Sequence, residues 1–507
     1  MTPSIPFDHR TVSRRAMLAL MGTGAAATVL ASCGIGGSGS TTAKKGSIGG
    51  TSGTALAAPP ELRSSGGLLE VVLTAAATMV PWGDGERYAL TFNGTVPGPT
   101  LRVRPGDLLR VTLKNDLDET TNLHTHGLHV SPDGNSDNVS LMIEPGRALT
   151  YEYQLPANHP SGTFWYHPHH HGYVASQVFG GLAGVIIVDD AIDDLPEMQS
   201  TTERILVLSD PRIGTTADVL VASTADKQQG REGDVVLVSG ALEPRIAAVS
   251  GSVERWRIVN ASSSRYYRLS VDAPNMYLIG SDQGRLRSPQ QVTDILLTPG
   301  QRAEVLVPLP NAGTVTLSTT AVDRGSMSMG GGMGGMGGMG RSRSSSNTDT
   351  RTTLLTVDVS RSSNTVAPVL PPILRGTMPA SGGATDSRRS ISFGAMSMGT
   401  GEFVIDGKSF DEHRIDTSAK LGTTEEWTIT NNSMMDHPFH LHVWPFQVLS
   451  RSNGAAPDPG WRDTVNIPTG QSVTILVPFE DYSGTTVYHC HILDHEDLGM
   501  MATINVS

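Results

Sequence analysis

One pattern occurs three times along the sequence, and this repetition restricts the chain to tandem copies of a small strand-rich unit. The first block of the pattern alternates apolar and polar residues up to an asparagine, in "LLRVTLKNDL" (108–117), "VERWRIVNAS" (253–262) and "TEEWTITNNS" (424–433). A second block places a turn containing proline before another strand, at 143–156, 297–310 and 467–480. A third block completes the unit at 161–170, 312–321 and 483–492. Alternation with a period of two is typical of half-buried strands, so the repeats indicate three similar β units.

The composition agrees with an all-β chain. It includes 56 glycines and 31 prolines, residues that end strands and form turns. Only two cysteines are present, so no framework of disulfides is available and stability must come from large apolar cores. We predict an all-β fold of three tandem Greek-key β-sandwiches, at residues 68–192, 199–360 and 390–507.

The N-terminal segment has the features of an export signal rather than of a folded domain. Twin arginines, Arg14 and Arg15, precede an apolar stretch that ends in "LASC" (30–33) and is too short to span a membrane permanently. "LASC" resembles a bacterial lipobox, in which Cys33 would become the lipid-modified first residue. We therefore predict a twin-arginine signal at 1–33, a flexible Gly/Ser linker at 34–67, and an extracytoplasmic protein anchored by lipid to the bacterial cell membrane. The alternative is an ordinary signal peptide with a chance cysteine.

Four histidine clusters carry the chemistry, and they fall in the first and third units: "HTHGLH" (124–129), "WYHPHHHG" (165–172), "HPFHLH" (437–442) and "HCHILDH" (489–495). Residues two apart in a strand face the same side, so each His-x-His pair offers two imidazoles to one face. The eight histidines concerned are His124, His126, His167, His169, His440, His442, His489 and His491. Eight imidazoles without a carboxylate suit copper or another ion that favours imidazole. They are too many for one centre and would suffice for three copper ions. The middle unit has "STT" (318–320) at the corresponding place and is predicted to be a spacer without metal ligands.

Cys490 lies between two of these histidines, so in a strand its side chain must face the opposite side. It could be a buried structural cysteine, the usual fate of a free thiol. However, His437 and His495 remain outside the His-x-His pairs, and Met500 follows the cysteine by ten residues. Two imidazoles, a thiolate and a weak axial thioether form a blue-copper electron-transfer site. We predict that one tripeptide serves two metal sites.

With these four motifs, residues 70 to 507 resemble the multicopper oxidases, the family of laccases, ascorbate oxidase and bacterial copper-efflux oxidases. The resemblance implies cupredoxin-like domains and four copper ions that couple four one-electron oxidations to the reduction of O2 to water. It implies type 2 copper at His124 and His440, and type 1 copper at His437, Cys490, His495 and Met500. It implies two type 3 ions, one held by His126, His167 and His491, the other by His169, His442 and His489.

Reduction of O2 also consumes protons, and two carboxylates are candidate carriers. Glu496 follows the ligand His495, and Asp137 lies eleven residues after His126. Both resemble acidic positions that relatives use for proton delivery. The alternative for each is a solvated surface acid. Outside the predicted signal, the histidines that fall beyond the ligand pattern are His129, His159, His170, His171 and His413, which we expect at the surface or around the ligands.

Methionines in flexible segments indicate a substrate. The loop 326–340 is rich in glycine and methionine, and thioethers are soft ligands that select Cu(I). Efflux-type relatives carry comparable segments. The candidate substrate ligands are Met327, Met329, Met333, Met336, Met339, Met396, Met398, Met434, Met435 and Asp436. The alternative is a low-complexity linker of drifting composition.

Three functions from different classes fit these features. The first is a copper-dependent oxidoreductase that uses O2 to oxidise Cu(I) in copper detoxification. The second is a laccase-like oxidase of phenols or aromatic amines, with the same ligands. The third is a copper store without catalysis, which leaves Cys490 unexplained, and a two-domain nitrite reductase is disfavoured by the third unit. The 49 acidic against 37 basic residues argue against nucleic acid as a partner, and we expect a monomer that contacts the membrane only through its lipid.

Overall fold

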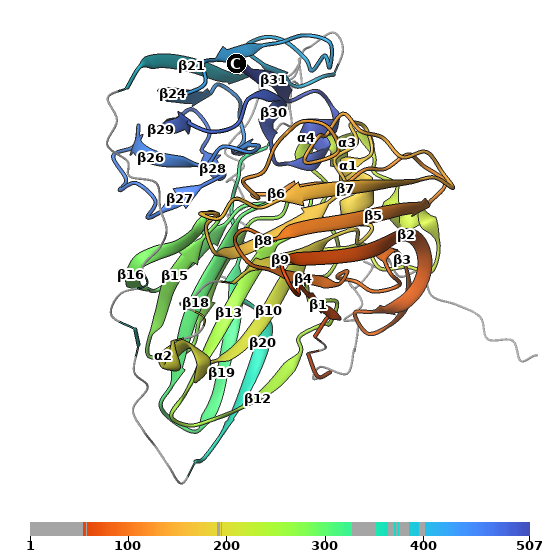
Figure 1. Cartoon of the computed structure of the whole chain (residues 1–507). Helices are drawn as coiled ribbons and strands as arrows, with labels where there is room; N and C mark the ends of the chain where they lie inside the picture. Colours follow the sequence, from red (N-terminus) through yellow and green to blue (C-terminus); the bar gives the residue numbers. More distant parts are fainter. Residues whose placement is uncertain are drawn as a thin grey trace, which may run out of the picture. The chain divides into compact units, whose positions relative to one another are not determined.

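The backbone is paired into six β-sheets in a computed structural model of the chain (Figure 1). The structure describes residues 54–56, 58–189, 193, 195–326, 351–362, 370–371, 374, 385–394 and 401–507. The predicted signal with Cys33 lies outside the described residues, as do Met327, Met329, Met333, Met336, Met339, Met396 and Met398.

The first two sheets face each other as the first sandwich. One has the order β3 (Gly85–Phe92), β2 (Leu68–Trp82), β5 (Leu108–Asp116), β7 (Ala148–Gln154). The other has the order β1 (Glu61–Arg63), β4 (Thr100–Val103), β9 (Gly184–Val188), β8 (Gly162–His167), β6 (His124–His126). β1 lies in the segment 34–67 that we predicted to be linker, but it pairs in parallel with β4 and Glu61 binds Arg102. The end of that segment is therefore part of the sheet.

The second sandwich consists of the next two sheets. One has the order β11 (Leu237–Val238), β10 (Thr202–Ser209), β13 (Ser252–Asn260), β18 (Arg302–Leu309), β15 (Met276–Ser281), β16 (Gly284–Val292). The other has the order β12 (Arg245–Val249), β20 (Arg351–Ser360), β19 (Gly313–Thr320), β14 (Tyr267–Val271), β17 (Ile295–Leu297).

The last two sheets form the third sandwich. One has the order β22 (Val404–Ile405), β21 (Ser387–Gly394), β24 (Thr423–Asn431), β29 (Ser472–Phe479), β26 (Phe446–Arg451), β27 (Trp461–Arg462). The other has the order β23 (Thr417–Ala419), β31 (Met501–Val506), β30 (Gly484–Cys490), β25 (His437–Leu441), β28 (Thr464–Ile467).

Helices are short and few among the described residues: α1 (Val174–Phe179), α2 (Pro196–Gln199), the 3-10 helix η1 (Ala217–Leu220), α3 (Thr224–Gln229) and α4 (Leu493–Asp497). Three of them, α1, α3 and α4, lie together beside β30 (Figure 1). In the described part of the chain, no helix has the length and apolar character needed to cross a membrane.

The sequence repeats become equivalent strand pairs. The first and second blocks form the antiparallel pairs β5–β7, β13–β18 and β24–β29. In each sandwich an earlier strand runs parallel to the first block: β2 to β5, β10 to β13 and β21 to β24. The predicted all-β fold is therefore confirmed, and the same order of three strands recurs in each sandwich: β2-β5-β7, β10-β13-β18 and β21-β24-β29.

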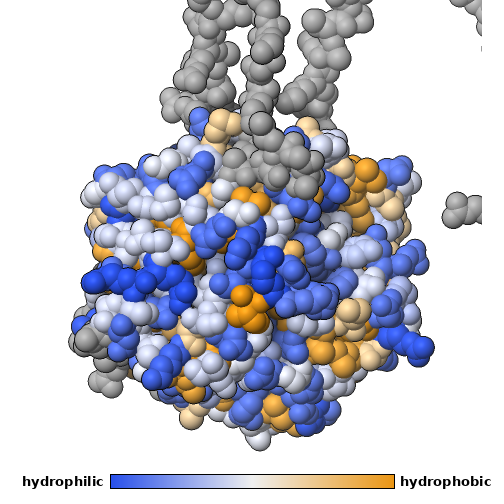
Figure 2. All heavy atoms as spheres, turned by 90° about the horizontal axis from the view of Figure 1, so that it is seen from above, coloured by the Kyte–Doolittle hydropathy of each residue, from blue (hydrophilic) through white to orange (hydrophobic). Residues whose placement is uncertain are grey.

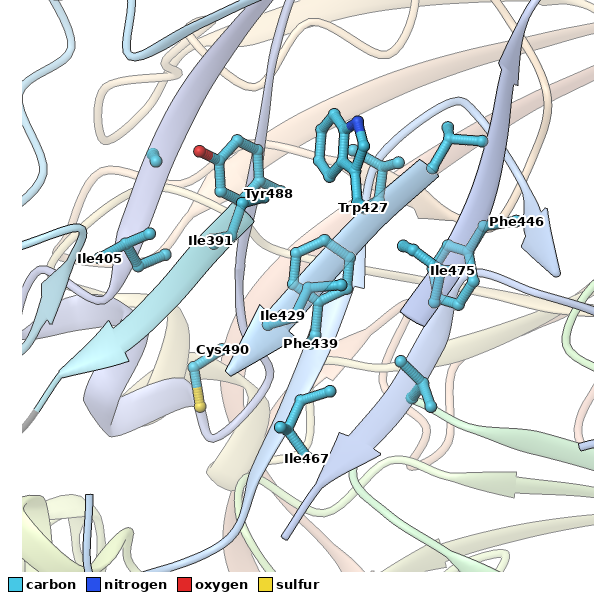
Figure 3. Packing of buried hydrophobic residues seen from close by; sticks show 14 of the residues in the cluster. Ile391, Ile405, Trp427, Ile429, Phe439, Phe446, Ile467, Ile475, Tyr488 and Cys490 are labelled. Atoms are coloured by element: carbon cyan, nitrogen blue, oxygen red, sulfur yellow. The ribbon is translucent and has the colours of Figure 1, made fainter. Parts of the chain in front are cut away.

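Each sandwich has its own apolar core between its two sheets. In the third sandwich, Trp427, Phe439 and Tyr488 are at most 1% exposed and pack ring against ring. Cys490 lies at one end of this core, with its sulfur on the side of the packed residues (Figure 3). The face of the molecule in Figure 2 is mainly hydrophilic, with apolar residues in small separate groups. The large apolar side chains are thus used mainly inside the sandwiches.

The asparagine that ends the first block makes the same hydrogen bonds in all three sandwiches. Each side-chain amide donates to a carbonyl four or five residues later and to the carbonyl of the first residue of the second block. Each side-chain oxygen accepts the N–H two residues on. The residues are Asn115 with Ile143 and Leu117, Asn260 with Leu297 and Ser262, and Asn431 with Ile467 and Ser433. This side chain therefore fixes the corner between the blocks.

We expect Asn260→Ala to lower the free energy of unfolding by about 2–4 kcal/mol, since it leaves two buried carbonyls and one N–H without their partner. Urea denaturation followed by tryptophan fluorescence measures the effect. The control is Asn311→Ala, which truncates an exposed asparagine in the same sandwich. Equal stability of the two variants would contradict the assigned role.

Candidate metal centres

The eight histidines of the His-x-His pairs meet where the first sandwich faces the third, and we call them the histidine cluster. β6 and β8 bring them from the first sandwich, with His124 opposite His167. β25 and β30 bring them from the third, with His440 opposite His489. His169, His442 and His491 follow the ends of these strands. Every member of the cluster is at most 2% exposed. Antiparallel pairing therefore brings residues from distant parts of the sequence to one buried junction.

Ligand atoms within the histidine cluster converge in three groups. In each group they lie within 4.8 Å of one another: His124, His126 and His440; His126, His167 and His491; His169, His442 and His489. The second and third groups are the sets that the resemblance implied for two type 3 ions, and the first contains the pair implied for type 2 copper. The structure thus brings together the residues that the sequence analysis assigned to three ions.

The imidazoles are oriented as metal ligands are. Nδ1 of His124 faces Asp137 at 3.0 Å, and Nδ1 of His167 and His440 donate to the carbonyls of Pro168 and Asp463 at 2.8 Å. Their opposite Nε2 atoms have no hydrogen-bond partner within the described ranges. Elsewhere in the cluster, Nε2 atoms point at each other, with those of His169 and His442 each 3.1 Å from Nε2 of His489. Lone pairs directed at a common point require a cation, and anchored second nitrogens are usual for ligating histidines.

Burial keeps these imidazoles neutral, which is the form that binds metal. Burial and the neighbouring imidazoles hold the pKa of His124 and His442 well below the ordinary value of 6.5. Burial lowers the pKa of His169 and His489 to about 4. The cluster therefore presents uncharged nitrogen donors at neutral pH, and its donor set fits copper.

Cys490 forms a second site with His437 and His495, which we call the cysteine site. Its Sγ lies 3.4 Å from Nδ1 of His437 and 3.8 Å from Nδ1 of His495, and the two Nδ1 atoms are 3.3 Å apart. Met500 is fully buried, and its carbonyl accepts the N–H of Cys490 at 3.0 Å. Burial raises the pKa of the thiol, so a bound cation is needed to hold it as a thiolate.

The second nitrogens of the cysteine site are also anchored. Nε2 of His437 lies 2.7 Å from Oγ of Ser433, and Nε2 of His495 lies 3.1 Å from the carbonyl oxygen of Gln228 in α3. Both contacts leave Nδ1 directed toward the sulfur. Cys490 groups with His437 and His495, whereas its neighbours His489 and His491 belong to the histidine cluster.

The two candidate proton carriers touch the histidine cluster. Asp137 faces His124 and accepts the N–H and hydroxyl of Thr125 at 2.9 and 3.1 Å, and burial raises its pKa to about 7. Glu496 Oε2 lies 3.1 Å from Nδ1 of His489, and burial raises the pKa of Glu496. Both side chains are at most 1% exposed, which excludes the alternative of solvated surface acids.

The remaining histidines lie outside the converging groups. His129 bridges the first and third sandwiches, because its ring nitrogens lie 2.8 Å from the carbonyl oxygen of Val443 and 2.6 Å from Asp481. His159 is buried, and its Nε2 accepts the N–H of His129 at 3.0 Å. His170 and His171 line a surface pocket that also reaches His169, and His413 is exposed. These positions agree with the expected surface and supporting places.

Sequence reasoning missed one acid that is as close to the ligands as Asp137. Asp463 is 1% exposed, and its Oδ1 lies 3.1 Å from Nε2 of His126. Burial alone would raise its pKa, but Arg302 and His126 hold the pKa of Asp463 well below its usual range. Nothing in "GWRDTV" (460–465) marks it, because its partners lie far away in the sequence.

Three predicted substrate ligands fall among the described residues. Met434 precedes His437 by three positions in the sequence and is 48% exposed. Met435, also a candidate substrate ligand, is fully buried in the core of the third sandwich. The carboxylate of Asp436 already accepts the side-chain amide of Asn466 at 2.8 Å and the N–H of Thr469 at 2.9 Å.

Sequence models of one family match all three sandwiches. Models described as multicopper oxidase match residues 74–192, 200–323 and 384–507. The multicopper oxidase mco of Staphylococcus epidermidis is 30% identical over 428 residues, 82% of this chain and 84% of that protein. The cell division protein FtsP of Xenorhabdus nematophila is 30% identical over 462 residues, 90% and 92% of the two chains.

Solved structures agree with these sequence matches. A multicopper oxidase of Campylobacter jejuni, described as a metallo-oxidase, is 31% identical, with a TM-score of 0.75 over 90% of this chain and 95% of that one. A laccase-like multicopper oxidase of Ochrobactrum sp., described as active towards lignin model compounds and lignosulfonate, is 29% identical, with a TM-score of 0.74 over 89% and 100%.

We expect the metal-free protein to lose stability as the pH falls below 6.5. Its buried imidazoles have pKa values below that of an unfolded histidine, so the unfolded state binds more protons in this range. For each such imidazole, the free energy of unfolding falls by up to about 1.4 kcal/mol for each unit of decrease in pH. For His169 and His489 this fall continues to about pH 4. Urea unfolding of the metal-free chain between pH 7.5 and 5 measures the slope. Equal stability at pH 7.5 and 5.5 would contradict the neutral cluster.

Proposed function

The chain belongs to the multicopper oxidase family, and from this premise we propose that it oxidises cuprous ion and reduces O2 to water. As a member of that family it is a copper-dependent oxidase. The choice of Cu(I) as electron donor rests on one observation, the pairing of Gly325, which precedes the methionine-rich segment, with Met435 near His437.

We assign four copper ions to the two sites. The cysteine site would hold type 1 copper, and the histidine cluster would hold one type 2 ion and two type 3 ions in the groups described above. Copper bound there supplies one-electron oxidation at the cysteine site and reduction of O2 at the histidine cluster. The fit is supported by the unpartnered Nε2 atoms, the facing imidazole nitrogens and the buried thiol.

The chain itself connects the two sites. Cys490 is joined by one peptide bond to His489 and by another to His491, which lie in the histidine cluster. Nδ1 of His489 also donates to the carbonyl of Cys490 at 3.0 Å. Electrons arriving at the cysteine site therefore have short covalent and hydrogen-bonded routes to the cluster.

We assign proton delivery to Asp137 and Glu496. Reduction of one O2 to two waters consumes four protons, and both carboxyl groups are buried against cluster histidines. Because the pKa of Asp137 is about 7, this group can hold and release a proton near neutral pH. The pKa of Glu496 is also raised, which favours a protonated form that can donate toward the cluster.

The donor assignment rests on the contact between two segments. Gly325, next to the start of the methionine-rich loop 326–340, forms a β-bridge with Met435. The carbonyl of Arg324 accepts the N–H of Asp436 at 2.7 Å. The described residue Gly325 therefore pairs with Met435, which precedes His437 by two positions in the sequence. Beside it, Met434 exposes a thioether, a ligand that favours Cu(I) over harder ions.

A laccase-like oxidase of phenols is the second candidate. It is favoured by the Ochrobactrum relative, which is described as acting on lignin model compounds. The same ligand residues would serve both reactions, so only the donor distinguishes them. Copper storage without catalysis does not account for the two-sided placement of Cys490.

We expect changing the five methionines of 326–340 to serine, together with Met434→Ser, to raise the apparent KM for Cu(I) by about tenfold, a loss of roughly 1.4 kcal/mol of binding. Phenol oxidation should hold steady or rise, because small phenols need no thioether. O2 uptake with each donor at equal enzyme concentration measures both effects.

Two controls accompany this comparison. Met79→Ser removes an exposed thioether from β2 of the first sandwich and should change neither donor's kinetics. Cys490→Ser should abolish the blue colour and all turnover while the fold persists. A fall in phenol turnover with unchanged Cu(I) kinetics would favour the laccase-like function instead.

We also propose that the protein is a monomer, exported by the twin-arginine pathway and held outside the cytoplasm by lipid on Cys33. The support is the "SRRAML" and "LASC" sequences and the linker composition that follows. We expect the protein to fractionate with membranes in its native host and Cys33→Ala to release it into the soluble fraction. Firm retention would require more than one acyl chain. A wholly soluble wild-type protein would contradict the lipid anchor.

A further inference from the structure

We propose that Asp463, held by Arg302 of the second sandwich, is a positioning residue for two metal ligands, His126 and His440. The proposal rests on the copper chemistry proposed above for the histidine cluster. Its evidence is a set of buried hydrogen bonds that joins all three sandwiches beneath the cluster.

The Asp463 carboxylate selects which nitrogen of His126 can bind metal. Oδ1 lies 3.1 Å from Nε2 of His126, whereas Nδ1 of the same ring lies 3.3 Å from Nε2 of His491. A neutral imidazole has one N–H, and an ionised carboxylate can only accept. The proton is therefore held on Nε2, and the lone pair of Nδ1 is directed at the metal position.

The backbone of Asp463 orients the second ligand. Its carbonyl oxygen accepts Nδ1–H of His440 at 2.8 Å, which leaves Nε2 of His440 for metal. The rings of His126 and His440 are stacked, with centroids 3.9 Å apart and planes 12° apart. A shift of Asp463 would therefore disturb two adjacent ligands, His126 assigned to type 3 copper and His440 assigned to type 2 copper.

Arg302 fixes the orientation of this carboxylate. Nη1 and Nη2 donate to Oδ1 and Oδ2 at 2.8 and 2.5 Å, a bidentate pair. The side chain of Gln283 donates to Oδ2 at 2.7 Å, and the hydroxyl of Thr464 donates to Oδ1 at 2.8 Å. Arg302 is fixed in turn by the carbonyls of Gly300 and Asp282, at 2.9 and 2.7 Å. The carboxylate cannot turn without breaking several of these contacts.

The second sandwich therefore does more than separate the other two. No group of three ligands in the described parts of the chain includes one of its residues. However, it supplies Arg302 and Gln283, and its turn before β18 packs on the cluster. Gly300 in that turn has φ +85°, and a Cβ there would lie 2.9 Å from Nε2 of His491 and 3.0 Å from Cε1 of His126.

The ion pair is better explained by positioning than by stability. Arg302 and Asp463 are both at most 1% exposed, and removing two charges from water costs about as much as their attraction returns. The net contribution of such a pair to folding is therefore small. Its hydrogen bonds, by contrast, determine the direction of two imidazoles.

Asp463→Asn tests the proposal, because the amide keeps the shape of the side chain but can donate to His126. We expect the apparent affinity of the histidine cluster for copper to fall by about ten- to a hundredfold, the usual effect of losing a partner of a metal ligand. Competition with a copper chelator measures it, and EPR should show an altered type 2 signal. The blue absorption of the cysteine site should not change.

Glu254→Gln is the matched control, because Glu254 is a buried acid paired with Arg204 within the second sandwich. It should leave affinity and EPR signal as in the wild type. Should Asp463→Asn fail to fold, Arg302→Lys tests the proposal by the same measurements, since lysine cannot form the bidentate pair. We expect this variant to lose less copper affinity than Asp463→Asn. Wild-type affinity and EPR signal in the folded variant would overturn the positioning role. A wild-type protein whose histidine cluster binds no copper would instead overturn the proposed function.

Discussion

The alternation of side chains along β30 is the constraint on which both metal centres depend. A strand must place Cys490 opposite its neighbours His489 and His491. Cys490 lies at the edge of the core of the third sandwich (Figure 3), whereas the two imidazoles belong to the histidine cluster at the junction with the first sandwich. Because Cys490 is bonded directly to His489 and His491, the peptide backbone holds the two centres at a fixed separation. The other ligands need to reach only one face of β30.

The short helix α4 extends this arrangement to all three sandwiches. It follows β30 and carries three acids with three different partners. Asp494 forms a buried ion pair with Arg231 of the second sandwich, at 2.7 Å. Glu496 faces His489, and Asp497 accepts the N–H groups of Gly172, Val174 and Ala175 at the start of α1. One turn of helix beside the cysteine site therefore connects the ligand His495 to every sandwich.

The second sandwich acts through contacts around the ligands. Gln228 of α3 anchors His495, while Arg302 acts on His126 through Asp463. Each contact leaves one ring nitrogen directed at a metal position, and neither requires the second sandwich to bind metal. Because the imidazoles are buried and neutral, their proton positions depend on such neighbours rather than on solvent. The first and third sandwiches therefore supply the imidazoles, and the second sandwich supplies groups that orient them.

The sequence by itself determined the strand pairs and the ligand types. Alternation and repetition are local properties, so they indicated β5, β13 and β24 and their partners before any tertiary contact was known. The His-x-His spacing and the position of Cys490 likewise follow from the geometry of a single strand. Tertiary structure alone decided what holds each ligand. His126 and Asp463 are 337 positions apart, and no local pattern relates them, because their contact exists only when three sandwiches pack around one buried junction.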